Sequence, residues 1–94
     1  MQVVWLKNAL NNLYEIAEYI SQDNPQAAQH VVDLIVEQVN QLAKQPALGR
    51  PGRVVGSREL VISSSHYLVP YRIKNNTVEV LRVFHTSRRL PTNW

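Results

Sequence analysis

The chain has 94 residues, of which 45% are apolar, and it contains no cysteine. This length makes a single domain over residues 1–94, and the apolar fraction is sufficient for a hydrophobic core. The absence of cysteine excludes a disulfide framework and thiolate metal sites, and no apolar run approaches the roughly 20 residues that span a bilayer. The first residues lack the charged start and the apolar stretch of a secretory signal, so no such signal is expected.

Charge is divided unevenly along the chain. Residues 1–47 hold two bases and five acids, a net charge of −3, whereas residues 48–94 hold eight bases and two acids, a net charge of +6. Seven of those eight bases are arginine, whose planar guanidinium binds carboxylate or phosphate through two parallel hydrogen bonds. The second half therefore indicates an anionic partner, either nucleic acid or an acidic protein segment. A basic surface that is only solvated is the alternative interpretation.

The first half predicts a short strand followed by two helices. Residues 3–6 are β-prone, and a helical period then predicts a helix over about residues 8–22. The apolar residues that define this period are Leu13, Ile16, Ala17 and Ile20. Asn24 is a good N-cap and Pro25 suits the first turn of a second helix, which ends near residue 45. Two helices with so short a connection pack as an antiparallel hairpin.

The second half predicts a loop and three strands. Glycine and proline mark residues 46–53 as a connection. The β-prone runs that follow cover about residues 57–62, 66–73 and 77–84. The Asn75–Asn76 pair between the last two indicates a tight hairpin turn, because asparagine tolerates positive φ.

The predicted order is β-α-α-β-β-β, which gives an α+β fold. In it, an antiparallel sheet packs against the N-terminal helical hairpin. Pro70 departs from the regular strand pattern, because proline has no N–H for the ladder. It predicts a bulge or less regular pairing nearby. Trp94 has little reason to lie in the core, and it either packs back on the sheet or stays free for a partner.

Several short segments, taken in order and at these spacings, form a specific set that covers nearly the whole chain. They are Trp5 in the first strand, Ala17–Ile20, Asn24–Ala28, Gln41–Gly52, Ser57–Val61, Tyr71–Ile73, Val80–His85 and Arg88–Arg89. Together they resemble the RelE/ParE superfamily of bacterial toxin–antitoxin toxins. The resemblance implies a small cytoplasmic toxin that needs no metal or other cofactor and is neutralised by a cognate antitoxin. RelE-like members cleave mRNA in the ribosomal A site, whereas ParE-like members inhibit DNA gyrase.

RNA cleavage without a metal needs a general base, a general acid and cations that stabilise the transition state. The available residues are His85, Glu59, Tyr67 or Tyr71 as acid or base, and Arg58, Arg72 and Arg82 as phosphate ligands. Thr86 follows His85 where several RelE-like nucleases carry a tyrosine, and Tyr67 stands about where they carry an arginine. Alternation along a regular strand also separates Arg82 from His85. We therefore favour a ParE-like gyrase inhibitor, with a RelE-like ribosome-dependent mRNA endonuclease as the alternative.

The resemblance also suggests which residues bind partners. The C-terminal region is implicated in ParE toxicity, so His85, Arg88 and Arg89 are expected to contact the target. An acidic, amphipathic C-terminal segment of the antitoxin is expected to lie over the helical hairpin and the basic sheet edge. Its apolar residues would contact Leu13, Ile16 and Ile20. Its carboxylates would pair with Arg58, Arg72 and Arg82.

Overall fold

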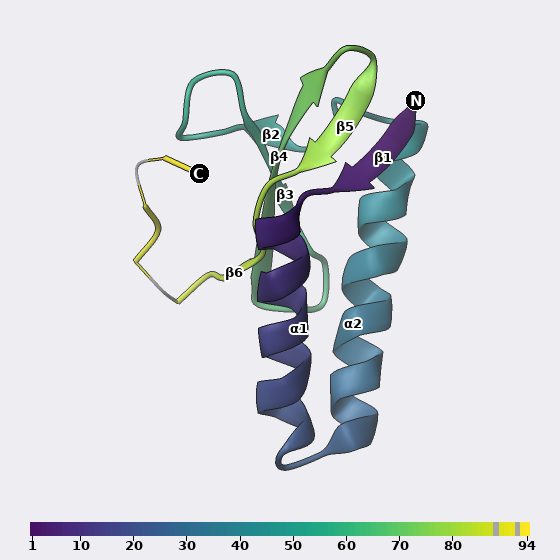
Figure 1. The fold of residues 1–94 in the computed structure, drawn as a ribbon, viewed down its shortest axis with the longest axis vertical. Helices are drawn as coiled ribbons and strands as arrows, with labels where there is room; N and C mark the ends of the chain where they lie inside the picture. The colour runs from purple at the N-terminus through teal and green to yellow at the C-terminus, as the bar shows by residue number, and fades with distance from the viewer. Residues whose placement is uncertain (88, 92) are drawn as a thin grey trace.

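The computed structural model describes residues 1–87, 89–91 and 93–94. The elements are β1 (Gln2–Trp5), α1 (Lys7–Ser21), α2 (Pro25–Asn40), the 3-10 turn η1 (Gln41–Ala43), β2 (Arg50–Pro51), β3 (Arg58–Val61), β4 (Tyr67–Lys74), β5 (Thr77–Val80) and β6 (Phe84–His85). The two helices lie side by side as a long hairpin, and they pack against one face of the sheet (Figure 1). This arrangement confirms the predicted α+β fold.

Local sequence features fix the helical hairpin as predicted. The side-chain oxygen of Asn24 accepts a hydrogen bond from the backbone N–H of Ala27 at 3.1 Å, and Pro25 occupies the first position of α2. The observed helices match the predicted ones to within one residue, except at the end of α2. There the chain tightens into η1 before it reaches Pro46. The capped joint directs α2 back along α1 and thereby positions the apolar sides of both helices over the sheet.

The sheet has the strand order β1-β5-β4-β3-β2, and β6 also pairs with β4. Asn75 and Asn76 form the predicted turn between β4 and β5, with φ angles of 51° and 60°. The prediction of a purely antiparallel sheet was wrong at one edge, where β1 pairs with β5 in parallel. A hairpin turn forces its two strands to be antiparallel. Because β1 reaches β5 through most of the chain, no such turn constrains its direction.

The last predicted strand, 77–84, is interrupted by a β-bulge opposite Pro70. Val80 pairs with Tyr71 and Phe84 pairs with Leu68, so three residues of one strand face two residues of β4. Pro70 has no N–H to donate, and its carbonyl accepts from the backbone N–H of Leu81 at 2.9 Å. The expected irregularity near Pro70 is confirmed, and it divides the strand into β5 and β6.

Tyr71 ties the loop before β2 to the middle of the sheet. Its side chain is fully buried, and its hydroxyl donates to the carbonyl of Pro46 at 2.6 Å and accepts from the N–H of Gly49 at 2.9 Å. Gly49 is required here, because a Cβ at this position would lie 2.7 Å from Cε1 of Tyr71. Burial raises the pKa of the Tyr71 hydroxyl, so this group remains a proton donor and serves structure.

Removing the hydroxyl of Tyr71 is expected to destabilise the fold. Tyr71→Phe leaves the N–H of Gly49 and the carbonyl of Pro46 without their partner, so the free energy of unfolding should fall by about 1–3 kcal/mol. Urea denaturation at neutral pH measures this change. Tyr14→Phe is the matched control, because the Tyr14 side chain is 68% exposed and the change there should stay within about 0.5 kcal/mol. Equal stability of the two variants would contradict the bridging role of Tyr71.

Candidate functional site

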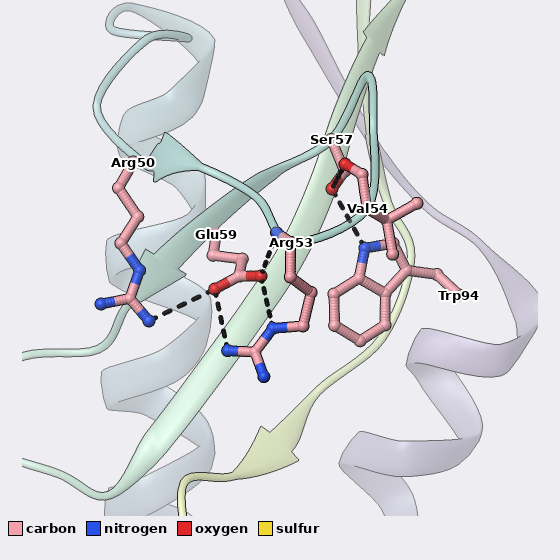
Figure 2. A network of polar contacts seen from close by, with 6 residues as sticks. All are labelled: Arg50, Arg53, Val54, Ser57, Glu59 and Trp94. Atoms are coloured by element: carbon pink, nitrogen blue, oxygen red, sulfur yellow. Dashed lines mark hydrogen bonds and ion pairs between the residues drawn. The ribbon is translucent and has the colours of Figure 1, made fainter. Parts of the chain in front are cut away.

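A buried carboxylate organises two arginines beside β3. Glu59 is only 2% exposed and accepts from Nη2 of Arg50 at 3.2 Å and from Nε of Arg53 at 2.9 Å. It also accepts from the backbone N–H of Arg53 at 2.9 Å, as Figure 2 shows. These bonds, above all the one from the Arg53 side chain, lower the pKa of Glu59 from 4.5 to about 2. Two guanidiniums around one carboxylate leave the cluster with an excess positive charge at the surface.

The three arginines predicted to hold phosphate or carboxylate all have intramolecular partners. Nη1 of Arg58 donates to the carbonyl of Gly49 at 2.6 Å, and Nε of Arg72 donates to Glu79 across β4 and β5 at 2.6 Å. Nε of Arg82, which lies in the bulge, donates to the carbonyl of Trp94 at 3.0 Å. The guanidinium of Arg82 also lies 3.1 Å from the amide oxygen of Asn8 when that amide faces it. Each arginine therefore holds part of the fold in place.

His85 lines a cleft of about 480 Å³ between α1 and the end of β6. Its ring meets that of Tyr67 edge to face, with centroids 5.3 Å apart, and Glu15 and Tyr19 come from the facing helix. Nδ1 of His85 accepts from the backbone N–H of Ser87 at 3.2 Å and lies 2.7 Å from its hydroxyl oxygen. In the neutral imidazole the proton is therefore on Nε2.

The structure does not gather His85 and the predicted phosphate ligands into one site. Arg58 pairs with Tyr71 and His85 pairs with Tyr67, so they stand four residues apart along β4, about 13 Å. Arg72 follows the buried Tyr71 and points to the opposite face of the sheet. Arg82 is directed away from His85 and binds Trp94. The compact acid–base–cation group that RNA cleavage needs is not formed by these residues in this conformation.

The two tyrosines and the glutamate considered as acid or base also have other roles. Tyr71 bridges a loop, and Glu59 is held as a carboxylate by its arginines. Tyr67 packs partly against the core and partly along the cleft of His85. Of the predicted target-binding residues in the C-terminal segment, Arg89 is exposed, and Arg88 lies outside the described residues.

The apolar residues of α1 that we expected to contact the antitoxin face mainly inward. Leu13 and Ile16 pack against the core, and Ile20 is half-buried, because this stripe is the one that holds the helix to the sheet. A second stripe, missed in the sequence, is exposed instead. Leu10 is 51% and Tyr14 is 68% exposed, and they line a groove of about 490 Å³. The other groove residues are Asn11, Leu13, Ala17 and Val32.

Among the described residues, no helix has the length and apolar character to cross a bilayer, and no group of three potential metal ligands occurs.

The Glu59 cluster was also missed in the sequence analysis. Its residues belong to the two short strands β2 and β3 and to the loop between them, and neither alternation along one strand nor helical spacing relates them. In contrast, the spacing of Leu10, Tyr14 and Ala17 at i, i+4 and i+7 could have revealed the exposed groove.

Residues 3–90 match the family model described as "ParE toxin of type II toxin-antitoxin system, parDE". The chain is 44% identical to the Y4kP protein of Sinorhizobium fredii, over 96% of this chain and 93% of that protein. It is 34% identical to the toxin RelE2 of Caulobacter vibrioides, over 93% of this chain and 97% of that toxin.

Several solved structures share the fold, and two of them come from toxin–antitoxin systems. One, from the chromosomal ParDE toxin–antitoxin system of P. aeruginosa, has a TM-score of 0.81 and 31% identity. The match covers 90% of this chain and 95% of that one. The other, from the RelBE2 toxin–antitoxin complex of Mycobacterium tuberculosis, has a TM-score of 0.58 and 25% identity, over 89% and 95% of the chains.

The Glu59 cluster should make stability depend on pH in the acid range. Glu59→Gln removes the charge that both arginines bind, so the free energy of unfolding at pH 7 should fall by about 2–3 kcal/mol. The folded-state pKa of about 2 lies below the ordinary 4.5. The carboxylate's contribution is therefore complete above pH 4.5 and is lost as the pH falls toward 2.

Urea denaturation of both proteins at several pH values measures this effect. The difference between the wild type and Glu59→Gln should be largest at neutral pH and should shrink steadily below pH 4.5. Glu37→Gln, on the exposed side of α2, is the control and should change stability by less than about 0.5 kcal/mol. If the difference in unfolding free energy between the wild type and Glu59→Gln stays constant down to pH 3, the lowered pKa assigned to Glu59 is wrong.

Proposed function

The chain belongs to the ParE toxin family of type II toxin–antitoxin systems, and from that membership we propose that it inhibits DNA gyrase. In this proposal the protein acts in the cytoplasm, and a cognate antitoxin neutralises it. The higher TM-score of the ParDE structure than of the RelBE2 structure supports a ParE-like activity. The protein would then act by binding its target and would not itself cut a nucleic acid.

The observation that carries the proposal is the dispersal of the candidate catalytic residues. His85 lies in the cleft beside α1, whereas Arg72 lies on the other face of the sheet. Arg58 lies on β3, and its partner Tyr71 is about 13 Å along β4 from Tyr67, the partner of His85. Cleavage of RNA requires these groups within reach of one phosphate, since acid–base catalysis acts over hydrogen-bond distances. Binding to a protein target has no such requirement, because contacts spread over a surface are sufficient.

The proposed target-binding surface consists of His85, Arg88 and Arg89. His85 opens into its cleft together with Glu15 and Tyr19, which offers a partner both polar and aromatic contacts. Arg89 is exposed, so its guanidinium can bind an acidic group of gyrase. The proposed antitoxin-binding surface keeps the predicted contacts of Leu13, Ile16 and Ile20. It also includes the groove of Leu10 and Tyr14, whose side chains are more exposed.

The alternative function is a ribosome-dependent mRNA endonuclease of the RelE kind. The 34% identity to the toxin RelE2 favours it, together with the position of His85 beside Glu15 in one cleft. In that case His85 would be the acid or base, and Arg58, Arg72 and Arg82 would hold phosphate after a rearrangement of their present bonds.

Purified protein should inhibit DNA supercoiling by gyrase and should leave ribosome-bound mRNA uncut. Arg89→Ala is expected to weaken inhibition by about 3–10-fold, because an exposed charge at the contact surface is lost. Lys74→Ala also removes an exposed positive charge, at the β4–β5 turn, and serves as the matched control. Supercoiling that proceeds unchanged at a large excess of the protein would refute the gyrase proposal. Cleavage of ribosome-bound mRNA would instead support the alternative.

The groove on the helical hairpin should contribute to antitoxin affinity. Tyr14→Ala removes an exposed aromatic ring from the groove and should weaken binding by about 10-fold, mainly through faster dissociation. Tyr19→Ala is the control, because this tyrosine is 75% exposed on the same helix but lines the cleft of His85 instead. Surface plasmon resonance with immobilised antitoxin measures both variants. Equal loss in the two variants, or none in either, would contradict a specific role of the groove.

A further inference from the structure

Trp94 folds back over the sheet and is held there by three separate contacts. Its indole Nε1 donates to the hydroxyl oxygen of Ser57 at 3.1 Å, and its ring lies 5.5 Å from that of Phe84. Its carbonyl accepts from Nε of Arg82 at 3.0 Å. Figure 2 shows the indole beside Ser57 and Val54. Contacts with a loop, with β6 and with the bulge fix the orientation of the ring.

The loop that accepts the indole is itself closed by hydrogen bonds. The hydroxyl of the buried Ser57 donates to the carbonyl of Val54 at 2.6 Å, which leaves a lone pair for the N–H of Trp94. The N–H of Gly52 donates to the carbonyl of Ser57 at 2.8 Å. Because both the loop and the indole are anchored, this surface is ordered before any partner arrives, which lowers the entropic cost of binding.

Trp94 forms one wall of a pocket of about 330 Å³ on this face. The other apolar walls are Leu6, Val54 and Leu81, and Arg72 lies at the rim. Val55 at the mouth is 100% exposed, although valine is usually buried. A pocket with aliphatic and aromatic walls of this size fits a large apolar side chain of a protein partner.

The charges around the pocket indicate the rest of the partner. Glu59 and Glu79 are already paired, with Arg50, Arg53 and Arg72, so the surroundings keep an excess positive charge. Arg72 donates only its Nε in the observed pair, and a guanidinium has five N–H groups. Arg72 can therefore bind a second carboxylate without releasing Glu79. An apolar residue with an acidic neighbour matches this arrangement.

We propose that this pocket receives a large apolar side chain of the antitoxin's acidic segment, and that Trp94 is the residue that determines which side chain fits. A neighbouring carboxylate of the same segment pairs with Arg72. The inference rests on the proposed function, because it takes the antitoxin as the partner. It adds a site on the sheet face that is separate from the helical groove.

The fluorescence of Trp94 tests whether the pocket is filled. The chain has two tryptophans, so Trp5→Phe leaves Trp94 as the only source of tryptophan emission in the chain. Binding of the full antitoxin should shift its emission to shorter wavelengths and reduce quenching by acrylamide, because the exposed side of the indole becomes covered. A complex that forms without either change would overturn the pocket proposal while leaving antitoxin binding intact. Failure to form any complex would overturn both.

Affinity measurements provide the second test. Trp94→Ala should weaken antitoxin binding about 10-fold, or about 1.4 kcal/mol, whereas Asn93→Ala at the exposed neighbouring position should change it less than about 2-fold. Unchanged thermal unfolding and Trp5 emission in Trp94→Ala would show that the fold is retained.

Val55→Asp provides a variant that does not depend on the folding of the C-terminal segment. It places a negative charge at the pocket mouth on a fully exposed side chain, so it should also weaken binding about 10-fold. Full affinity in both Trp94→Ala and Val55→Asp would overturn the proposal. If single-stranded RNA, and not the antitoxin, changes the Trp94 emission, the pocket is a nucleic-acid site and the proposal is wrong.

Discussion

The missing N–H of Pro70 is the constraint on which the arrangement of the functional residues depends. A β-bulge opposite this proline inserts one residue between β5 and β6, so the alternation of side chains shifts after Val80. Val83 then enters the core, Phe84 turns toward Trp94, and His85 turns toward Tyr67. Without the bulge, the same residues would exchange faces, and neither the cleft beside α1 nor the pocket beside Trp94 would have its present walls.

The arginines show why a basic composition alone does not indicate nucleic-acid binding. Glu59 holds Arg50 and Arg53, Glu79 holds Arg72, and backbone carbonyls accept from Arg58 and Arg82. These bonds leave part of each paired guanidinium at the surface, but they fix its direction. An arginine fixed in this way suits a carboxylate that arrives at a defined angle from a protein chain. The positive charge of the second half therefore has a structural role, which a count of basic residues does not reveal.

Features set by neighbouring residues could be predicted from the sequence, and features set by distant contacts could not. The cap at Asn24 and the turn at Asn75–Asn76 were predictable because each depends on a few adjacent side chains. The parallel pairing of β1 with β5 joins residues more than 70 positions apart, and no local pattern encodes it. The bond between Trp94 and Ser57 also joins residues that are far apart in the sequence. The groove of Leu10 and Tyr14 could have been predicted, because helical spacing places both residues on one stripe of α1.

The helical groove and the Trp94 pocket lie on different sides of the protein, which limits the kind of antitoxin segment that can use both. The smaller extents of the molecule are 27 and 24 Å, so a chain that passes from the helices to the uncovered face of the sheet must cross a comparable distance. An extended chain spans about 3.3–3.6 Å per residue, and this path alone therefore takes roughly eight residues. A folded domain could not follow it. A disordered segment can, but it loses conformational entropy at each residue that it orders, so its affinity depends on well-placed apolar anchors at both ends.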